Sequence, residues 1–419
     1  ILMRGLYDIS IMLLGLGIYV ASFFNKKAKQ RIKTGDAWKT TLPSGPYDLW
    51  MHCASLGEFD QGLPVLWEFK SKYPEAKILV TFFSPSGLNH YHKRSHCVDQ
   101  ACLIPLDRRK NVRDFLNHTK PKTVVFVKYE FWLNFIFGIS KRNIPLFSIS
   151  TLLRKNQFIF NPLGGLFRNA LKRFTHFYAQ TVQTKELLSD IGIQEVTVSG
   201  DTRYDHVLNQ QRNAMENQAN NPELAQLQKY CEGKSVFILG SSWLVEEEMV
   251  HAIHQRIPLD LTLIAPHDIS EKHLYEIEAM FGDECIRLSE INGLTSETVI
   301  LIDCIGILHQ LYQLANIAFI GGGYTGKLHN ILEPAAYGIP VVFGPTHHKF
   351  PEAEEFIAKG LASEVSTSQD LLDKIQLFMR NHEVTKSKII GFVQEKSGAT
   401  KRISSHLFST LAHSDFPSN

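Results

Sequence analysis

The sequence predicts an α/β protein built from two doubly wound, Rossmann-like domains behind an apolar N-terminal helix. In both halves of the chain, short runs rich in Val, Ile and Phe alternate with helical segments, as is typical of buried parallel strands. A polar stretch rich in Asn and Gln, 209–221, separates the two halves. The length of 419 residues also exceeds one ordinary core and suits two domains of ~150 to 200 residues.

Two successive sets of strand and helix units imply two sheets, and they predict five segments. The segments are an apolar helix with its basic flank (1–33), a first α/β domain (34–208), a linker (209–233), a second α/β domain (234–395) and a C-terminal helix expected to pack back on the first domain (396–419).

The N-terminal segment has the composition of a membrane anchor. Ile9–Phe24 carries no formal charge, and a basic cluster, 26–33, follows at once. A spanning helix needs ~20 apolar residues, so both a tilted span and a helix lying in the interface fit this length. The basic cluster places the rest of the chain on the cytoplasmic side. A cleaved signal peptide is the alternative, because 20–22 is a run of small residues, but only Arg4 precedes the apolar run.

The apolar runs of the two domains are expected to be parallel strands. In the first domain they are 49–52, 77–83, 122–127, 144–149, 177–180 and 195–199; in the second they are 235–239, 261–265, 299–302, 317–320 and 340–343. Open α/β sheets bind ligands at the carboxyl ends of their strands. The residues that directly follow these runs are therefore the candidates for chemistry.

Two carboxylates and one cation follow strands of the first domain. Glu58 comes after 49–52 and is a candidate general base, although Ser55 and Glu58 also have the spacing of a helix capping box. Glu130 follows 122–127. Arg203 follows 195–199, and its alternative role is a surface salt bridge. Together the three would make a catalytic arrangement.

In the second domain, the stretch 321–334 (GGGYTGKLHNILEP) follows a strand and opens a helix. Its three glycines let backbone approach a ligand closely, and a helix N-terminus offers N–H groups to phosphate. The alternative is a capped turn, because Asn330 and Glu333 also have capping-box spacing. An NTPase P-loop is excluded, since Leu328 stands where Ser or Thr would hold magnesium.

The composition argues against several classes of protein. A net charge of +2 gives no support for a nucleic-acid partner. The six cysteines form no CxxC pair, which indicates free thiols in a reducing compartment. The eighteen histidines include the adjacent His347 and His348 but no HExxH motif, so we expect neither a metal site nor a cofactor.

Six motifs taken in order resemble the 3-deoxy-D-manno-octulosonic acid (Kdo) transferases of lipopolysaccharide synthesis. The resemblance covers nearly the whole chain, including the N-terminal helix. The motifs are 55–58 (SLGE), 130–132 (EFW), 199–205 (SGDTRYD), 240–242 (GSS), 265–267 (APH) and 329–334 (HNILEP).

This resemblance implies a GT-B glycosyltransferase, whose two domains face a central cleft. It implies an inverting, metal-independent reaction that moves Kdo from CMP-Kdo to a lipid A precursor, lipid IVA, at the cytoplasmic face of the bacterial inner membrane. The first domain would bind the acceptor and the second would bind the CMP-sugar. Glu58 matches the family's general base, and Glu130 and Arg203 match positions that support the transition state.

The resemblance also implies the binding residues. Those for CMP are Pro266, His267, Gly306, Ile307, Leu308, Asn330, Ile331, Leu332 and Glu333. Further donor contacts are expected at Ser241, Ser242, Gly322, Gly323 and Lys327, and acceptor contacts at Ser55, Gly57, Ser86, Gly87, Lys93 and Arg94. The chain departs from the family's usual Lys, Arg and Glu at Arg203, His267 and Ile307, and this puts the details of CMP binding in doubt.

Two other functions stay open at this point. One is a GT-B enzyme acting on another nucleotide sugar, either a transferase or a 2-epimerase. The other is a non-catalytic, membrane-tethered protein that binds a nucleotide sugar.

Overall fold

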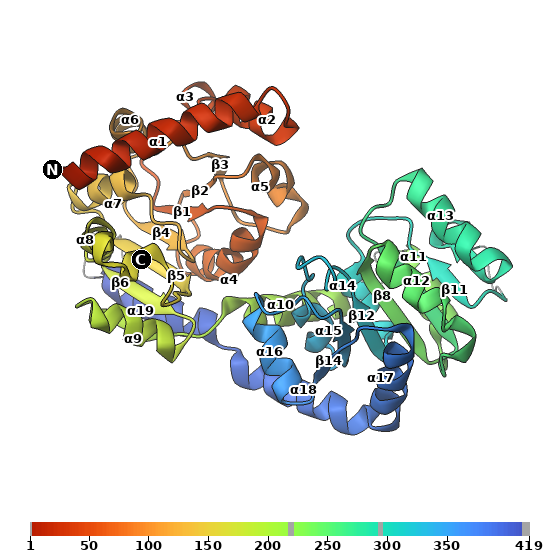
Figure 1. Cartoon of the computed structure of the whole chain (residues 1–419). Helices are drawn as coiled ribbons and strands as arrows, with labels where there is room; N and C mark the ends of the chain where they lie inside the picture. Colours follow the sequence, from red (N-terminus) through yellow and green to blue (C-terminus); the bar gives the residue numbers. More distant parts are fainter. Residues whose placement is uncertain (1, 217–221, 292–295, 413–419) are drawn as a thin grey trace. The chain divides into compact units, whose positions relative to one another are not determined.

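The computed structural model describes residues 2–216, 222–291 and 296–412. The chain forms two compact units, each around its own seven-stranded sheet (Figure 1). Unit 1 comprises Ile1–His206 with Lys396–Asn419, and unit 2 comprises Val207–Glu395. The stretch expected as a linker, 209–233, contains the end of α10 (Thr202–Glu216) and α11 (Pro222–Cys231), while 217–221 lie outside the described residues.

The sheet of unit 1 is parallel, with the strand order β3-β2-β1-β4-β5-β6-β7. The order reverses between β1 and β4, which makes this the switch point at which doubly wound sheets bind ligands. The strands are β1 (Leu49–Cys53), β2 (Ile78–Phe82), β3 (Gln100–Leu103), β4 (Val124–Val127), β5 (Leu146–Thr151), β6 (His176–Ala179) and β7 (Val196–Val198).

Alternate residues of each strand feed two hydrophobic cores, one on either face of the sheet. Trp50 of β1 packs with Phe115 and Phe135 in one core, while Met51 of the same strand packs with Phe59 in the other. The flanking helices are α4 (Leu56–Lys72), α5 (Pro85–His90), α6 (Arg109–Thr119), α7 (Leu133–Ser140), α8 (Gly165–Leu171) and α9 (Val182–Asp190).

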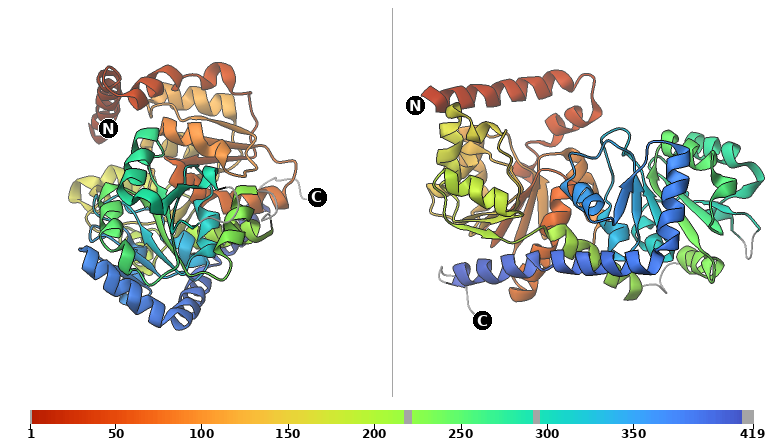
Figure 2. Two further views of the ribbon diagram at one scale, coloured as in Figure 1. Left: turned by 90° about the vertical axis from the view of Figure 1, so that its right-hand side faces the viewer. Right: turned by 60° about the horizontal axis from the view of Figure 1, so that its bottom comes forward.

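The helix α19 (Ala399–Ala412) belongs to unit 1 although it closes the chain. It lies against α4, and Leu407 and Leu411 are fully buried in the core that contains Met51 (Figure 2). The carboxylate of Asp205 accepts the N–H groups of Gly398 and Thr400, so it holds the start of α19.

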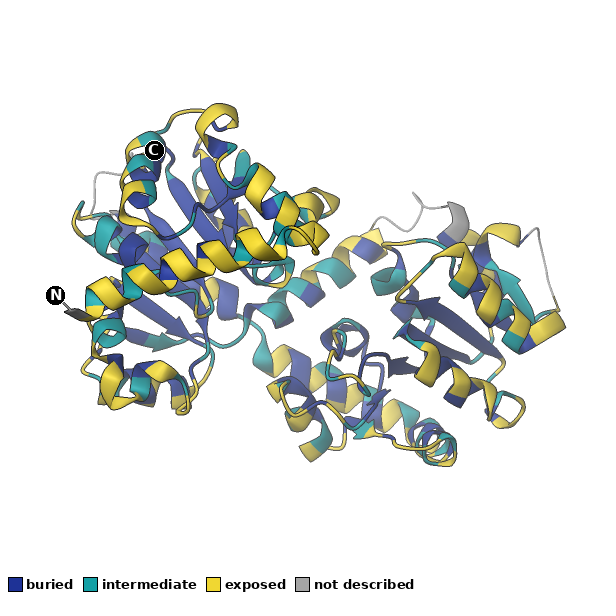
Figure 3. Cartoon of the chain, turned by 45° about the horizontal axis from the view of Figure 1, so that its top comes forward, coloured by how far each residue is buried: buried dark blue, intermediate teal, exposed yellow. Residues whose placement is uncertain are grey.

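The helix α1 (Leu2–Ala21) lies along unit 1 and precedes α2 (Lys26–Thr34) and α3 (Trp38–Thr41). Tyr7 donates to Asp107 (2.6 Å), Asp8 accepts from Asn134 (2.9 Å), and Ile11 is buried. The opposite face of α1 is exposed and apolar (Figure 3). Its exposed members include Leu6, Ile9, Met12, Leu13, Leu16, Tyr19 and Val20.

Unit 2 has a second parallel sheet, with the order β10-β11-β9-β8-β12-β13-β14. Its strands are β8 (Val236–Ser242), β9 (Leu261–Pro266), β10 (Cys285–Arg287), β11 (Val299–Leu301), β12 (Ile317–Ile320), β13 (Val341–Phe343) and β14 (Ala362–Glu364). Its helices are α12 (Leu244–His251), α13 (Glu271–Phe281), α14 (Leu308–Leu311), α15 (Leu332–Ala336), α16 (Pro351–Ala358), α17 (Ser368–Arg380) and α18 (His382–Lys396). Two doubly wound α/β sheets confirm the predicted fold class.

Candidate active site

Two carboxylates lie at the switch point of unit 1. Glu58 stands in the first turn of α4, directly after β1, and Glu130 follows β4, which pairs with β1. The hydroxyl of Ser55 donates to the Glu58 carboxylate, and it makes no capping hydrogen bond to the helix backbone. The Ser55 and Glu58 pair therefore does not form the capping box that its spacing allowed, and its carboxylate is available for chemistry.

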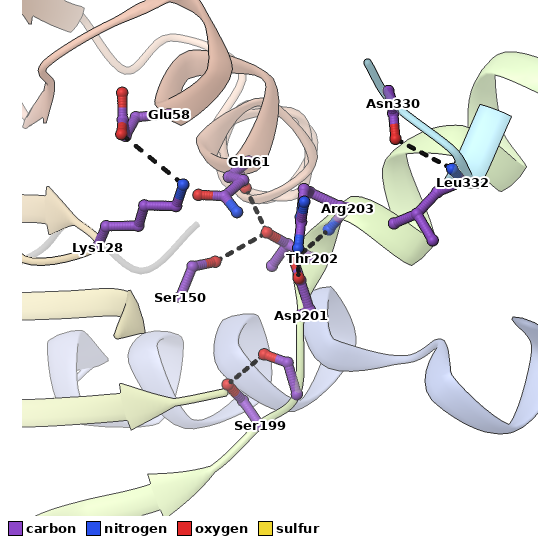
Figure 4. A network of polar contacts seen from close by, with 11 residues as sticks. Glu58, Gln61, Lys128, Ser150, Ser199, Asp201, Thr202, Arg203, Asn330 and Leu332 are labelled. Carbon is purple, nitrogen blue, oxygen red and sulfur yellow. Dashed lines mark hydrogen bonds and ion pairs between the residues drawn. The ribbon is translucent and has the colours of Figure 1, made fainter. Parts of the chain in front are cut away.

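A lysine that the sequence reasoning missed completes this arrangement. The Nζ atom of Lys128 lies 3.8 Å from Oε1 of Glu58, and both side chains are largely shielded from solvent (Figure 4). Lys128 adopts a positive φ of 63°, which is uncommon for a residue with a side chain and occurs often at functional sites. Its position directly after the predicted strand 122–127 could have identified Lys128 as a candidate from the sequence. Its ammonium group places a positive charge beside the Glu58 carboxylate.

Glu130 has no lysine or arginine within ion-pair distance among the residues that the structure describes, unlike Glu58. Burial, and then the charge of Glu58, raise the pKa of Glu130 to about 7. Nε2 of His52 lies 4.0 Å from Glu130, and burial lowers the pKa of His52 to about 3, so this ring is neutral. Trp132 donates to the same Nε2 (3.2 Å), which leaves the proton of His52 on Nδ1, facing Thr81 (2.9 Å).

The two carboxylates are therefore differentiated by their surroundings. Glu58 has a cation beside it, while Glu130 holds its proton up to about pH 7. Carboxylate pairs whose environments separate their protonation states can act as base and acid in one site. Unit 1 thus has the groups to accept one proton and to donate a hydrogen bond.

Arg203, which was expected to join Glu58 and Glu130 in the site, forms an ion pair with a neighbouring residue. Its guanidinium makes an ion pair with Asp201 (2.7 Å) at the start of α10. Thr202, between them, donates to the Gln61 carbonyl (2.7 Å) and meets the hydroxyl of Ser150 (2.9 Å), as Figure 4 shows. These bonds fasten the 199–205 motif to α4, the helix that carries Glu58.

The other residues expected to contact the acceptor have different surroundings. Gly57 and Lys93 are exposed, and Ser86 is half-buried on α5. Gly87 packs against the Phe82 ring, where a Cβ atom would collide. The guanidinium of Arg94 pairs with Asp60 of α4 through two hydrogen bonds (2.9 and 3.2 Å). Gly87 thus has a packing role, and the Arg94 charge is already matched.

The glycine turn of unit 2, 321–323, packs closely against backbone of neighbouring segments. A Cβ on Gly321 would meet the Ser241 carbonyl, and one on Gly323 would meet backbone of Gly344. Gly322 has a φ of +85°, and its N–H donates to the buried carboxylate of Glu246 (2.9 Å). The three glycines therefore allow backbone to pack on backbone in the direction of a Cβ atom, and the N–H of Gly322 already has a partner. Donor contacts at Gly322 and Gly323 stay a prediction.

Three aromatic rings gather beyond the ends of β8, β9 and β12. The exposed His267 follows Pro266 and stacks on Trp243, with ring centroids 4.5 Å apart. His329 lies on the other side, 4.8 Å from His267 between centroids. Burial, and then the charge of His267, lower the pKa of His329 to about 4, so His329 is neutral near pH 7. Nearby, the buried Ser242 donates to Glu247 (2.7 Å).

The remaining residues expected to bind CMP divide into core and surface. Ile307, Ile331 and Leu332 are buried, so their side chains serve packing. Asn330 accepts from the Leu332 N–H (3.1 Å) and donates to Glu333 (3.2 Å). The other surface members are Gly306, Leu308 and Lys327, together with the half-buried Ser241. The helix α15 has only five residues, so its N-terminus is a weaker anion site than the sequence suggested.

Comparisons with known proteins show what the chain is similar to. A family model described as 3-deoxy-D-manno-octulosonic-acid transferase (kdotransferase) matches residues 23–206. A 3-deoxy-D-manno-octulosonic acid transferase of Aquifex aeolicus is 29% identical over 346 residues, which cover 80% of this chain and 87% of that protein. The enzyme of the same name from Haemophilus influenzae is 24% identical, over 85% and 86% of the two chains.

Among solved structures, the UDP-GlcNAc 2-epimerase of Neisseria meningitidis has a TM-score of 0.60 at 16% identity, covering 86% of this chain and all of that one. A 2-epimerase from Rickettsia bellii has a TM-score of 0.54 at 13% identity, over 88% and 98% of the two chains. At such identities the likeness shows the fold alone, which is of the GT-B type. The sequence relatives are transferases, and over most of its length the chain is similar to the 3-deoxy-D-manno-octulosonic acid (Kdo) transferases, a family of glycosyltransferases.

Proposed function

We propose that the protein transfers Kdo from CMP-Kdo to a lipid A precursor, lipid IVA, with inversion at the anomeric carbon and without a metal ion in the chemical step. The observation that carries this proposal is the pair of differentiated carboxylates at the switch point of unit 1. Glu58 is held by Ser55 and faces Lys128 at 3.8 Å, while Glu130 has a pKa of about 7.

In this mechanism Glu58 accepts the proton of the acceptor hydroxyl. The acceptor oxygen then bonds to the anomeric carbon of Kdo, and CMP leaves with the electron pair of the broken bond. Glu130, protonated up to about pH 7, donates a hydrogen bond to an oxygen that gains negative charge. Arg203, held by Asp201, adds positive charge at the start of α10.

Unit 2 would hold the donor. We assign the ribose hydroxyls to Asn330 and Glu333, which already exchange a hydrogen bond and so are oriented together. The phosphate would be held by Lys327 and by a ring N–H of His267, because the N–H of Gly322 donates to Glu246. The other proposed donor contacts are Pro266, Gly306, Leu308, Ser241 and Ser242.

The location we propose is the cytoplasmic face of a bacterial inner membrane, with α1 lying in the interface. One face of α1 contacts unit 1 through Tyr7, Asp8 and Ile11. The helix is long and apolar enough to cross a membrane by composition, yet only 11% of its apolar window is buried in the protein. A helix docked on one side and apolar on the other suits an interfacial position.

A transfer assay with CMP-Kdo and a lipid A precursor in EDTA tests the reaction. Glu58→Gln should keep CMP binding and lower the rate of glycolipid formation by about 10² to 10⁴-fold, the usual contribution of a general base. Glu68→Gln, an exposed position on the same helix, is the matched control and should transfer normally. Near-normal transfer by Glu58→Gln would refute the role of Glu58, and loss of wild-type transfer in EDTA would refute the metal-free step.

The same assay separates the alternatives. An epimerase would convert a UDP-sugar without any lipid acceptor. A non-catalytic binder would bind CMP-Kdo but release no CMP. Release of CMP in step with a glycolipid product supports the transferase alone.

A further inference from the structure

We propose that unit 2 contains a binding site for a divalent transition metal ion of the zinc type, formed by His347, His348 and Glu354. The two histidines lie in the loop after β13, and Glu354 stands in the first turn of α16. These residues match no zinc motif, because the third ligand comes six residues after His348, on a helix. The site is independent of the transfer reaction proposed above.

The ligand atoms already converge. Nδ1 of His347 lies 3.0 Å from Oε1 of Glu354, and Nδ1 of His348 lies 2.6 Å from the same oxygen. All three ligand atoms are within 4.8 Å of one another. Bonds of about 2.0 to 2.2 Å to a tetrahedral zinc ion would separate such atoms by roughly 3.3 to 3.6 Å. Glu354 is half-exposed and can withdraw by the small distance required.

A second line of support comes from the buried ring of His347, in which Nε2 is paired with Glu364 and Nδ1 faces the proposed site. Only 1% of the residue is exposed. Nε2 lies 2.8 Å from Glu364, whose carboxylate can only accept, so Nε2 carries the proton. Nδ1 is buried as well and faces Oε1 of Glu354 at 3.0 Å, away from hydrogen-bond geometry. A cation between this nitrogen and the carboxylate oxygen would contact both.

The surroundings of His347 are those of a metal ligand. A histidine that binds a metal through one nitrogen commonly donates from the other to a carboxylate, which fixes the ring and strengthens the ligand. Glu364 plays this part from β14, the strand that pairs with β13. The Phe343 ring packs against His347 at 5.2 Å between centroids. The ring is therefore oriented before any ion binds.

The chemistry of the ligands selects the class of ion. Two imidazoles and one carboxylate suit zinc and its transition-metal neighbours, whereas magnesium and calcium prefer oxygen ligands. The loop is also tied to the glycine turn, because Thr346 donates to the Gly323 carbonyl (2.7 Å). A bound ion would thus fasten this loop to α16 beside that turn, as a structural clamp.

The test is a calorimetric titration of the full-length, EDTA-treated and dialysed protein with ZnCl₂, supported by the visible spectrum of added Co²⁺. We expect one ion per chain, and a Co²⁺ spectrum typical of four-coordinate nitrogen and oxygen ligation. His348→Ala and Glu354→Ala, both at accessible side chains, should abolish binding without unfolding the protein. Glu364→Gln should weaken binding by about 10 to 100-fold, as loss of such an outer partner does.

His251→Ala, an exposed histidine at the end of α12, is the control and should bind zinc like the wild type. Zinc binding that survives in both His348→Ala and Glu354→Ala would overturn the proposed ligands. The proposal also fails if the wild type binds no zinc. NMR that then finds the His347 ring doubly protonated at neutral pH would show that a proton alone bridges the two side chains.

Discussion

At the scale of single residues, burial decides what the carboxylates after β1 and β4 can do. Glu58 and Glu130 have the same chemical group and follow neighbouring strands. Lys128 faces Glu58, whereas Glu130 is partly desolvated and feels the negative charge of Glu58. The pKa of Glu130 is therefore raised from the 4.5 of a free Glu side chain to about 7.

This shift predicts how stability depends on pH. Between pH 4.5 and about 7 the unfolded chain ionises Glu130 while the folded protein keeps it protonated, so the wild type loses stability through this range, and the loss is complete above about pH 7. Glu130→Gln stays neutral in both states, so its stability should rise relative to that of the wild type from pH 4.5 to about 7 and then keep a constant lead. At 1.36 kcal/mol per pKa unit, a shift of 7 − 4.5 = 2.5 units gives at most about 3 kcal/mol.

The measurement is thermal or urea unfolding of both proteins across this range. Glu68→Gln, at an exposed position, serves as the control and should show a constant difference from the wild type. A difference for Glu130→Gln that is also independent of pH would contradict the assigned pKa.

The residues that the sequence predicted at the strand ends do lie there, but the sequence did not predict which side chains contact them. Lys128 is four residues after Val124 in sequence, yet its role depends on a positive φ that turns its side chain toward Glu58. The glycines of the 321–323 turn were interpreted as room for a ligand, and backbone of other segments lies in the direction of their Cβ atoms. Such contacts join residues far apart in the chain, so local patterns carry no record of them.

At the scale of elements, α1 shows how one helix satisfies two different surroundings. Residues spaced three or four apart, including Tyr7, Ile11 and Gly15, face unit 1. The remaining apolar residues face outward, and exposing so many apolar side chains to water is energetically unfavourable. The sequence was compatible with both a membrane-spanning and an interfacial helix, because hydropathy does not show which face of the helix contacts the rest of the protein.

We expect Leu13→Asp combined with Leu16→Asp to abolish membrane binding without lowering the melting temperature. Both side chains are more than half exposed, so unit 1 does not need them. Each leucine side chain that enters the membrane contributes about 1.5 kcal/mol to binding. Removing both should lower the partition coefficient of the protein between membrane and water by about 100-fold. Flotation with vesicles of phosphatidylethanolamine and phosphatidylglycerol measures this.

Ser10→Asp, an exposed polar position of the same helix, is the matched control. The interfacial position further predicts that alkaline carbonate releases the wild-type protein from membranes. Resistance to carbonate would indicate a spanning helix, and unchanged flotation of the double variant would exclude α1 as the anchor.

The strands that the sequence did not predict are β3, β10 and β14. β3 and β10 end their sheets on one side, and β14 ends the sheet of unit 2 on the other. They are three or four residues long and partly exposed. An edge strand has one neighbour and a thinner covering, so it needs no continuous apolar run. The central strands are buried on both faces, so their continuous apolar runs predicted them. The edge strand β7 was also predicted, because Val196 and Val198 stand in the run 195–199.

At the scale of the whole molecule, the last helix of the chain completes the first unit. Leu407 of α19 is fully buried in the core formed by β1 and α4. Leu407→Ala should lower the free energy of unfolding by about 2 to 5 kcal/mol, the usual loss for a buried leucine. Unfolding in urea, followed for each variant, measures the effect.

The control is Ser405→Ala, which is exposed on the same helix and should change stability little. A small effect of Leu407→Ala would show that α19 adds little to unit 1. A ligand that binds only unit 2 should still bind the Leu407→Ala protein at low urea, because that unit has a separate core.

The sequence by itself determined the two doubly wound sheets, the apolar N-terminal helix and the motifs of the Kdo transferase family. These follow from local periodicity and from residue types at strand ends, which a single chain displays directly. Only the tertiary structure decided that Lys128 meets Glu58, that Glu130 holds its proton near pH 7, and that His347, His348 and Glu354 converge. Distances, burial and ring orientation arise when separate segments pack, and they set the protonation and ligand geometry on which chemistry depends.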